Sequence, residues 1–461
     1  MAGASLLRTE QADADAVQPV NLELVTLTET SAVITWYTGE PGTDDGLGRM
    51  RPAPADGEVV YGTHPSRLTQ TVAEDADTAY HYVELTGLEP GRTYYYQARS
   101  RGKAATATPL VGGQAAGDPL AGGVYRFTTP QPPPGRFLFS IALCNDLHLG
   151  ETVAGLVGQL PWIKGIEQAP GRPPYPDVMA KALVEDARRR GATYLLAAGD
   201  ISAEAEPEDV ARAKQLLDRF GAHRRDYFVA RGNHDRAHEG SDYASCSPGR
   251  WQGGDCFRDG FFDGDEPTYF SRDLHGLRVI GLDTYDKPGD GGDAGGLSAE
   301  QLAWFERELA ADRDRPTIVF GHHPLFVENA PLALTGSQSL DPGQALRILT
   351  AYARTPGVLL HHAGHTHRNQ RSVFPLAPAV VQQEVAAVKE YPGGFTLLRI
   401  HSGGYALNFY KTRAELAREW SERSRQELAG LWPQLSFGCR VTDRNSVVTR
   451  DLSGIGRPDP T

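Results

Sequence analysis

The sequence is poor in cysteine and contains no long apolar run. Four of its 461 residues are cysteine, which is too few for a disulfide-rich scaffold, and no two have the Cys-x-x-Cys spacing of a zinc site. Cys246 and Cys256 lie ten residues apart in a glycine-rich segment, and the sequence is equally compatible with a disulfide and with two free thiols. No stretch approaches the roughly 20 apolar residues that span a bilayer, so we expect no membrane-spanning helix.

Positive charge is also scarce. Lys and Arg total 46 against 58 Asp and Glu, which gives a formal net charge of −12, and the basic residues form no stripe. Because such a surface repels nucleic acid and anionic lipid, we predict that neither nucleic acid nor a membrane is a partner. A phosphate group would have to be bound by a local device, most simply by metal.

The first 17 residues are polar and acidic, and they lack the apolar segment of a signal peptide. On this ground we predict a cytoplasmic location, although a chain whose secretory leader had been removed would have the same sequence. The sequence leaves the oligomeric state open.

The hydrophobic pattern changes near residue 130. Before it, short alternating runs separated by turn residues predict a β-sandwich. After it, continuous apolar runs alternate with amphipathic segments, which predicts a layered α/β domain with Ser298 as the N-cap of one helix. The predicted segments are a disordered tail (1–17), the β-sandwich (18–130), a proline-rich linker (131–135), the α/β domain (136–411) and a C-terminal segment (412–461) with a helix over 414–431 and an irregular remainder.

The predicted β-sandwich resembles a fibronectin type III module, and most of all the sandwich at the front of purple acid phosphatases. The resemblance rests on Leu88, Pro90, Tyr94 and Tyr96, with Trp36 upstream. It implies that Tyr94 is the corner tyrosine, whose hydroxyl bonds back to the preceding turn.

Five segments of the α/β domain place Asp, Asn or His directly after an apolar run. They are Asp146-Leu-His148, Gly199-Asp200, Gly232-Asn-His-Asp235, Gly321-His-His-Pro324 and Gly364-His-Thr-His367. Ligands of open α/β sheets collect at the strand ends, so we expect these segments to converge. In Asp146-x-His148 the strand period of two would put both side chains on one side.

These segments supply more ligands than one metal ion needs. Oxygen donors mixed with imidazole suit Mn, Fe or Zn. Two ions sharing one carboxylate would use all the groups and form a clamp, about 3.5–4 Å across, for a phosphoryl group. The candidate ligands are Asp146, His148, Asp200, Asn233, His322, His365 and His367.

The five motifs, in this order, resemble the calcineurin-like metallophosphoesterase superfamily over residues 136–411. The resemblance implies a four-layer αββα sandwich that hydrolyses a small phosphomonoester or phosphodiester through attack of a metal-activated hydroxide. It implies one ion on Asp146, His148 and His367, and a second on Asn233, His322 and His365. Asp200 would bridge the two ions.

The same resemblance implies roles for residues beside the ions. His234 would protonate the leaving group, and Asp235 would orient His234 and hold its tautomer. His323 would pack beside the site, because the His-x-Pro ending of the family points to His322 as the ligand. Arg368, Asn369 and His238 follow two of the motifs and are candidate substrate contacts.

The motifs depart from those of purple acid phosphatases and look more like the class III cyclic nucleotide phosphodiesterase branch. Ala203 stands where the former carry the tyrosine that colours their iron, and GNHD replaces their GNHE. We therefore do not expect a purple Fe(III) centre. Two other functions are weighed against the phosphoesterase: a non-catalytic binding or scaffold protein with a vestigial metal site, and a nuclease.

Two long irregular segments follow metal motifs, and we predict that they form walls of the substrate pocket. They span residues 150–176 and 238–265, and both are rich in glycine. Loops of such length inside a compact domain tend to be functional.

Overall fold

The computed structural model describes residues 17–44, 49–155, 164–238, 246–247, 253–287, 292–327 and 338–458. The predicted disordered tail, apart from Val17, lies outside the described residues, as do parts of both predicted wall segments. In the described part of the chain, no helix is long and apolar enough to cross a membrane.

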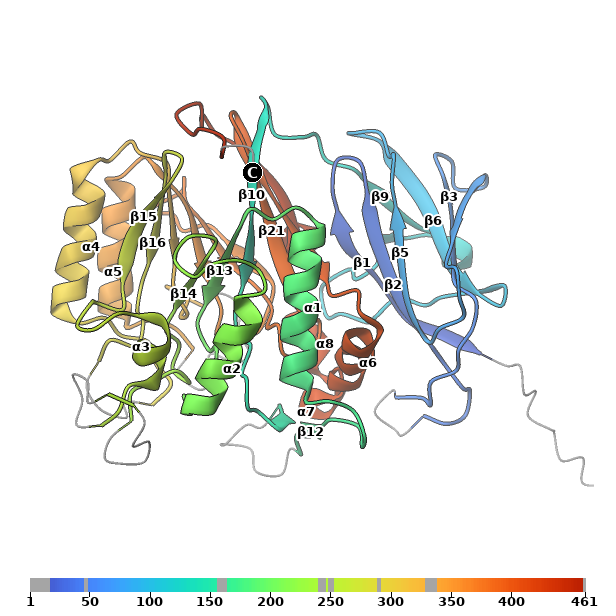
Figure 1. Cartoon of the computed structure of the whole chain (residues 1–461). Helices are drawn as coiled ribbons and strands as arrows, with labels where there is room; N and C mark the ends of the chain where they lie inside the picture. Colours follow the sequence, from blue (N-terminus) through green and yellow to red (C-terminus); the bar gives the residue numbers. More distant parts are fainter. Residues whose placement is uncertain are drawn as a thin grey trace, which may run out of the picture.

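The N-terminal region is a sandwich of two sheets, drawn in blue in Figure 1. One sheet contains β1 (Gln18–Leu27), β2 (Ala32–Gly39) and β5 (Tyr80–Leu85). The other contains β4 (Gln70–Ala73), β3 (Glu58–Gly62), β6 (Thr93–Ser100), β9 (Tyr125–Thr128) and β8 (Asp118–Pro119), with β7 (Lys103–Ala104) beside β6 and the 3₁₀ turn η1 (Ala121–Gly123) before β9. The predicted corner is confirmed, because the Tyr94 hydroxyl accepts a hydrogen bond of 3.0 Å from the Glu89 N–H.

Two six-stranded sheets form the centre of the α/β region. The first has the order β14 (Tyr227–Ala230), β13 (Tyr194–Ala198), β10 (Phe137–Cys144), β21 (Gly394–His401), β22 (Gly404–Lys411) and β23 (Asn445–Thr449). The second has the order β15 (Phe270–Leu274), β16 (Leu277–Gly281), β17 (Thr317–Phe320), β18 (Val358–Ala363), β20 (Val381–Glu384) and β19 (Gln370–Ser372). The strands that carry the predicted motifs are parallel within each sheet, and β10 is buried at every residue after its first.

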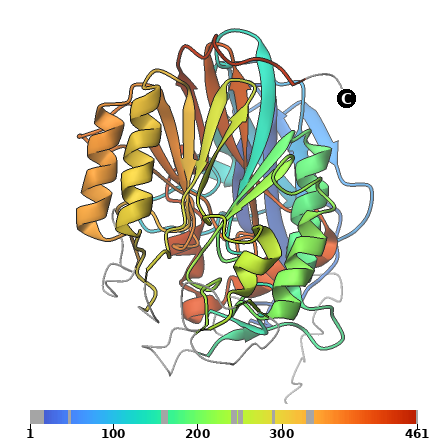
Figure 2. The same ribbon diagram turned by 60° about the vertical axis from the view of Figure 1, so that its left-hand side comes forward.

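Helices cover the outer faces of these sheets, which gives the four layers visible in Figures 1 and 2. On the first sheet lie α1 (Tyr175–Arg189) and α2 (Pro207–Leu217); on the second lie α4 (Ala299–Ala311) and α5 (Pro342–Ala353). The Ser298 side chain accepts from the Gln301 N–H at 3.1 Å, so the predicted N-cap is confirmed. The short helix α3 (Cys256–Phe261) contacts α2, and the hairpin β11 (Val153–Ala154) and β12 (Ile166–Glu167) follows the first motif.

The N-terminal sandwich covers the part of the first sheet that α1 and α2 leave open. Strand β1 packs against β22, and the amide of Asn408 donates to the Leu27 carbonyl at 2.9 Å. The amide of Asn445, at the start of β23, donates to the Val25 carbonyl at 3.0 Å. Side chains of the α/β region are therefore bonded directly to the backbone of the sandwich.

The C-terminal segment differs from the prediction. The helix predicted over 414–431 is interrupted by a turn at residues 425–426, which divides it into α6 (Glu415–Ser424) and α7 (Glu427–Gly430). Inside α7, Leu428 and Ala429 have non-helical φ angles of 50° and 56°. The remainder, predicted to be irregular, contains α8 (Trp432–Ser436), α9 (Val441–Arg444) and β23. The β-branched run of β23 pairs antiparallel with β22 and forms the edge of the first sheet.

The cysteine question that the sequence left open is answered by the structure. Cys246 and Cys256 form a disulfide, whereas Cys144 and Cys439 are free thiols.

Candidate metal centre

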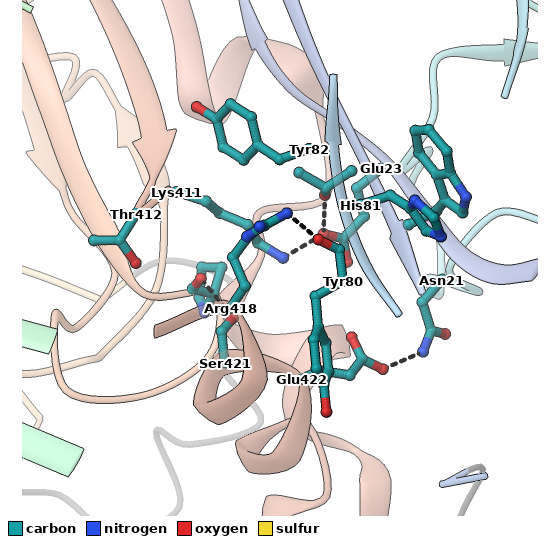
Figure 3. Close-up of a pocket in the computed structure, with 13 residues that line it drawn as sticks. Asn21, Glu23, Tyr80, His81, Tyr82, Lys411, Thr412, Arg418, Ser421 and Glu422 are labelled. Atoms are coloured by element: carbon teal, nitrogen blue, oxygen red, sulfur yellow. Dashed lines mark hydrogen bonds and ion pairs between the residues drawn. The ribbon is translucent and has the colours of Figure 1, made fainter. Parts of the chain in front are cut away.

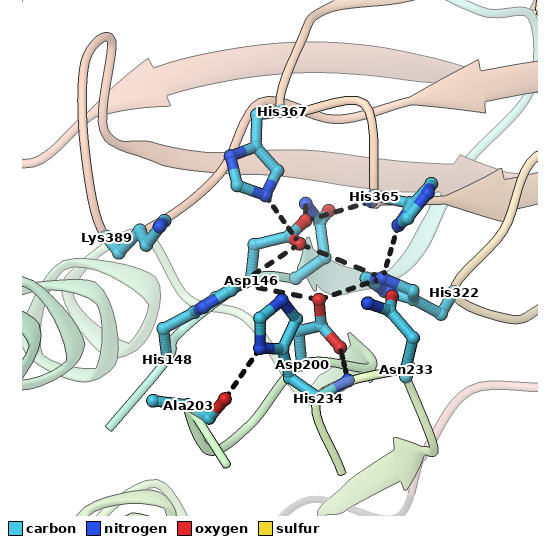
Figure 4. A network of polar contacts seen from close by, with 12 residues as sticks. Asp146, His148, Asp200, Ala203, Asn233, His234, His322, His365, His367 and Lys389 are labelled. Atoms are coloured by element: carbon cyan, nitrogen blue, oxygen red, sulfur yellow. Dashed lines mark hydrogen bonds and ion pairs between the residues drawn. The ribbon is translucent and has the colours of Figure 1, made fainter. Parts of the chain in front are cut away.

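The five predicted motifs meet where the two sheets come together at the carboxyl ends of their strands. Asp146 and His148 follow β10, Asp200 follows β13, and Asn233 follows β14, all in the first sheet. His322 follows β17, and His365 and His367 follow β18, in the second sheet. Figure 4 shows all seven side chains in one place. The two layers therefore both contribute to the site.

The backbone is strained at this point. Five of the seven predicted ligands have left-handed φ angles: Asp146 (54°), His148 (47°), Asp200 (50°), His365 (66°) and His367 (50°). Each such residue costs roughly 1–3 kcal/mol, and strain of this kind collects at functional sites. It also corrects the geometry expected for Asp146-x-His148: β10 has ended at Cys144, so the strand period does not place these two side chains.

Glycine permits the close approach of the strand ends. A Cβ atom on Gly364 would lie 2.7 Å from Asp146 Oδ2, and a Cβ atom on Gly232 would collide with the Asp200 carboxylate. Any larger residue at these two positions would push apart the segments that carry the candidate ligands.

The two carboxylates lie between the histidines. Asp146 Oδ1 is 3.0 Å from His367 Nε2 and 3.7 Å from His148 Nε2. Asp200 Oδ2 is 3.0 Å from His322 Nε2 and 3.4 Å from His148 Nε2. Asp200 therefore faces histidines of both predicted ion sites.

Overlapping sets of ligand atoms, each set within 4.8 Å, connect the carboxylates and histidines of the cluster. They are Asp146, His148 and His367; Asp146, Asp200 and His322; His148, Asp200 and His234; and His322, His323 and His365.

Unpartnered polar atoms test whether this cluster fits metal ions. Within the described part of the chain, Asp146 Oδ1, His148 Nε2 and Asn233 Oδ1 are buried and make no hydrogen bond. Buried polar atoms without a partner cost free energy. Such atoms occur at other places in the described part of the chain too, but these three lie together on predicted ligands. A cation would satisfy all three, so the residues fit the metal centre that the sequence predicts.

Polar partners behind three of the histidines leave Nε2 facing the centre. His322 Nδ1 donates to the Ala198 carbonyl at 2.9 Å, and His367 Nδ1 donates to Glu390 Oε1 at 2.7 Å. His148 Nδ1 lies 2.8 Å from Glu151 Oε2. Such partners fix the tautomer that leaves Nε2 available to a metal ion.

Sequence reasoning missed Glu151 and Glu390, and also Lys389, which binds Glu151. The signal for Glu390 was weak: Lys389-Glu390 interrupts an otherwise apolar stretch after Val385, and both side chains are buried.

The charged groups of the cluster shift one another's pKa values. Burial acts to raise the pKa of Asp146, but His367 and His322 lower it well below its usual range. Burial likewise acts to lower the pKa of His367, but Asp146 and Glu390 outweigh it and raise that pKa to about 9. A metal ion would take the place of these protons, so metal binding and proton release are linked.

His234 lies beside the candidate ligands. Its backbone N–H donates to Asp200 Oδ1 at 2.9 Å, and its ring centre is 4.5 Å from that of His148. Its Nδ1 donates to the Ala203 carbonyl at 2.6 Å, so Nε2 is the atom that can gain or lose a proton. Burial lowers the pKa of His234, and the Asp200 charge opposes this effect.

The predicted role of Asp235 is wrong. Its carboxylate does not contact His234 but accepts hydrogen bonds from the Ile201 N–H at 3.0 Å and from the Ser202 N–H at 2.9 Å. It also accepts from the Ser202 hydroxyl and from the Gly232 N–H. Asp235 therefore ties the loop after β13 to the loop after β14, and the Ala203 carbonyl holds the tautomer of His234.

Both ring nitrogens of His323 make hydrogen bonds to other residues. Nδ1 is 2.8 Å from the Thr284 hydroxyl, and Nε2 donates to the Asp293 carbonyl at 2.9 Å. Its neighbour His322 contacts Asp200, as the motif suggested.

Arg368 and Asn369 make contacts within the protein, and their contact with substrate stays a prediction. The Arg368 guanidinium is buried and binds both oxygens of Glu384, at 2.8 and 3.1 Å. The Asn369 side chain is also buried; its Oδ1 accepts from the Ala386 N–H at 3.2 Å and its Nδ2 lies 3.4 Å from the Phe437 carbonyl. His238 is half-buried, its N–H donates to the Gly254 carbonyl, and its contact with substrate stays a prediction.

Comparison with known proteins gives matches to both regions. Residues 139–369 match the family model described as calcineurin-like phosphoesterase, and residues 17–111 match that of the purple acid phosphatase N-terminal domain. The structure of purple acid phosphatase PPD1 from yellow lupin (Lupinus luteus) seeds is similar at 16% identity and a TM-score of 0.44, covering 96% of this chain and 77% of that one.

Curated relatives match a shorter stretch. The probable glycerophosphodiester phosphodiesterase GpdQ of Arcobacter nitrofigilis is 34% identical over 95 residues, which are 20% of this chain and 32% of that protein. The glycerophosphodiester phosphodiesterase GpdQ of Enterobacter lignolyticus is 32% identical over 97 residues, 19% of this chain and 32% of that protein. The chain thus spans about a third of the length of the curated relatives that it matches. On the match that covers half of its length, the chain belongs to the calcineurin-like phosphoesterase family.

Proposed function

We propose that the protein is a dinuclear metal-dependent phosphoesterase that hydrolyses a small phosphomonoester or phosphodiester. The observation that carries the proposal is the position of Asp200, whose carboxylate faces His148 on one side and His322 on the other. A carboxylate in that position is suited to bridge two ions.

Asp146, His148 and His367 would hold the first ion, Asn233, His322 and His365 would hold the second, and Asp200 would contribute to both. When bound, such a pair lowers the pKa of a water molecule and neutralises the charge of a phosphoryl group. The donor set of carboxylate, amide and imidazole suits Mn, Fe or Zn.

His234 supplies the proton for the leaving oxygen. The Ala203 carbonyl keeps one proton on Nδ1, so the second proton of the charged ring is carried on Nε2. Because burial lowers the pKa of His234, the protonated ring is a stronger acid than a histidine in water. Asp235 keeps the two loops around this ring together.

The names of the curated relatives make a phosphodiester the first substrate to test. Both are named as glycerophosphodiester phosphodiesterases, and they match about a fifth of this chain. A glycerophosphodiester and the corresponding phosphomonoester therefore belong in the same assay.

A panel of phosphoesters tests the proposal. Protein freed of metal with a chelator is supplied with Mn, Fe or Zn separately, and hydrolysis of p-nitrophenyl phosphate, its bis ester and a glycerophosphodiester is measured together with bound metal. We expect activity that needs metal, and we expect Asp200→Ala to lose both bound ions and the activity. The exposed Glu208→Ala variant serves as the control. Activity in metal-free protein, or an unchanged rate in Asp200→Ala, would overturn the proposal.

A further inference from the structure

One loop connects the metal centre to the N-terminal sandwich. We propose that residues 388–391 form a positioning loop through which the sandwich fixes one of the two ion sites, the one built from Asp146, His148 and His367. The inference rests on the proposed function. It adds a role for the sandwich and for Lys389, Glu390 and Tyr391, which lie outside the motifs.

The first step is the contact of the loop with two candidate ligands. Glu390 accepts from His367 Nδ1 at 2.7 Å. Lys389 Nζ lies 2.6 Å from both oxygens of Glu151, whose Oε2 is 2.8 Å from His148 Nδ1. Lys389 Nζ is also 3.5 Å from Glu390 Oε2. One ammonium group therefore sets the spacing of the two carboxylates that orient His148 and His367.

The loop is also fixed to the third ligand of this site. The Lys389 N–H donates to the Asp146 carbonyl, and the Val388 N–H donates to the Asn145 carbonyl, both at 3.1 Å. In Figure 4, Lys389 stands on the side of the centre that carries His148 and His367. A shift of the loop would move the supports of all three ligands together.

The C-terminal segment closes over the loop from behind. The indole of Trp420 donates to the Lys389 carbonyl at 2.6 Å, and that of Trp432 donates to the Tyr391 carbonyl at 3.0 Å. The Tyr391 N–H donates to the Ser424 hydroxyl at 2.9 Å. These bonds leave the backbone of the loop little freedom.

The sandwich reaches the same loop through Glu23 of β1. The Tyr391 hydroxyl donates to Glu23 Oε1 at 2.6 Å, and Glu23 is 1% exposed. Its carboxylate also binds Lys411 Nζ at 2.6 Å and Arg425 at 2.5 Å, and both cations lie over the Tyr391 ring. Figure 3 shows Glu23 and Lys411 reaching toward each other in the pocket between the two regions. Glu23 thus holds the side chain of Tyr391 in place.

In the described part of the chain, His322 of the other ion site has no such connection to the sandwich. His322 is oriented by the backbone carbonyl of Ala198, at the end of β13 in the neighbouring sheet. Further ion pairs cross the interface, among them Glu29 with Arg399 at 2.6 Å and Glu84 with Arg190 at 3.0 Å, and neither of these two includes a residue of 388–391. These pairs provide matched controls for Glu23.

The test measures metal affinity site by site. The full chain is freed of metal and titrated with Co²⁺, whose visible absorption reports the coordination of each equivalent; His365→Ala identifies which equivalent belongs to the second site. We expect Glu390→Ala to weaken the His148 and His367 equivalent roughly 10- to 100-fold and to leave the other equivalent unchanged. Glu390→Gln, whose amide oxygen still accepts from His367, recovers most of the affinity.

The interface variants extend the test to the sandwich. We expect Glu23→Gln and the milder Tyr391→Phe to weaken the same equivalent by a smaller factor, and Glu29→Gln to change neither. Equal loss at both sites in Glu390→Ala, no loss at either, or the same loss in Glu29→Gln as in Glu23→Gln would overturn the inference. Wild-type protein that binds two equivalents but hydrolyses no phosphoester would overturn the proposed function alone. Wild-type protein that binds fewer than two would overturn both.

Discussion

The two candidate ion sites share Asp200 but differ in how far along the chain the groups that orient their histidines lie. His148 and His367 are oriented by Glu151 and Glu390, which Lys389 ties together, and the loop that carries Lys389 also contacts the N-terminal sandwich. His322 is oriented by a carbonyl of β13, in the neighbouring sheet of the same domain.

The difference separates two requirements of a metal centre. Strand ends bring the ligands together, and this alone is sufficient for His322. His148 and His367 are instead oriented by buried charged side chains, Glu151 and Glu390, and these are held by Lys389 from a distant part of the chain. One site therefore depends on the catalytic fold, and the other depends on the assembly of the whole chain.

The largest effect is expected where the two sites meet. Asp200→Ala should remove both ions and lower kcat by about 10³-fold or more, because the clamp supplies several kcal/mol of transition-state stabilisation. Rate and bound metal are measured on the same preparations. Loss of one ion only would show that Asp200 does not bridge, and the two sites would then have no ligand in common.

His234→Ala separates the acid from the ligands. We expect kcat to fall about 10²- to 10⁴-fold for an ester with an alkyl alcohol leaving group, with a much smaller fall for a nitrophenyl ester, whose leaving group needs no proton. Metal affinity at both sites should be unchanged, since His234 is bound to the Ala203 carbonyl. An equal fall for both esters would contradict the role of proton donor.

Acid should weaken the interface through Glu23. Burial acts to raise the pKa of Glu23, but Lys411 and Arg425 lower it to about 2, from a usual value of 4.5. Because the folded pKa is the lower one, Glu23 contributes stability above pH 4.5 that is lost as the pH falls toward 2, about 3 kcal/mol in all.

The free energy of unfolding of wild type and of Glu23→Gln, measured between pH 6 and pH 3, checks this expectation. The wild type should lose stability more steeply over the acidic part of this range than the variant, which has no carboxylate to protonate. Parallel curves would mean that Glu23 is not held ionised by the interface.

The smallest effect is expected inside the sandwich. Tyr94→Phe removes the hydrogen bond from the Glu89 N–H and should lower the free energy of unfolding by about 1 kcal/mol. Both metal affinities should stay the same, because Tyr94 lies in the sandwich core, away from Glu23 and the loop. A change in metal affinity would show that the site responds to any loss of sandwich stability.

The sequence was informative where chemistry and local structure coincide. Apolar runs followed by Asp, Asn or His predicted the strand ends that carry the ligands, and Ser298 predicted the start of α4, because a cap is a contact three residues long. The αββα layers followed from the resemblance that these motifs carry.

The sequence was silent where contacts are long-range. Lys389 binds Glu151 across 238 residues and Tyr391 binds Glu23 across 368, and no local pattern marks such pairs. Strand β23 was predicted to be irregular because a short edge strand depends on its partner β22 for hydrogen bonds. The ion pair of Arg368 with Glu384 was likewise not marked by any local pattern.

Anomalous X-ray scattering from crystals grown with Mn²⁺ tests the central claim most directly. We predict two peaks about 3.5–4 Å apart, one beside His148 and His367 and one beside His322 and His365, with the Asp200 carboxylate between them. A single peak, or two peaks that Asp200 does not join, would contradict a shared dinuclear centre.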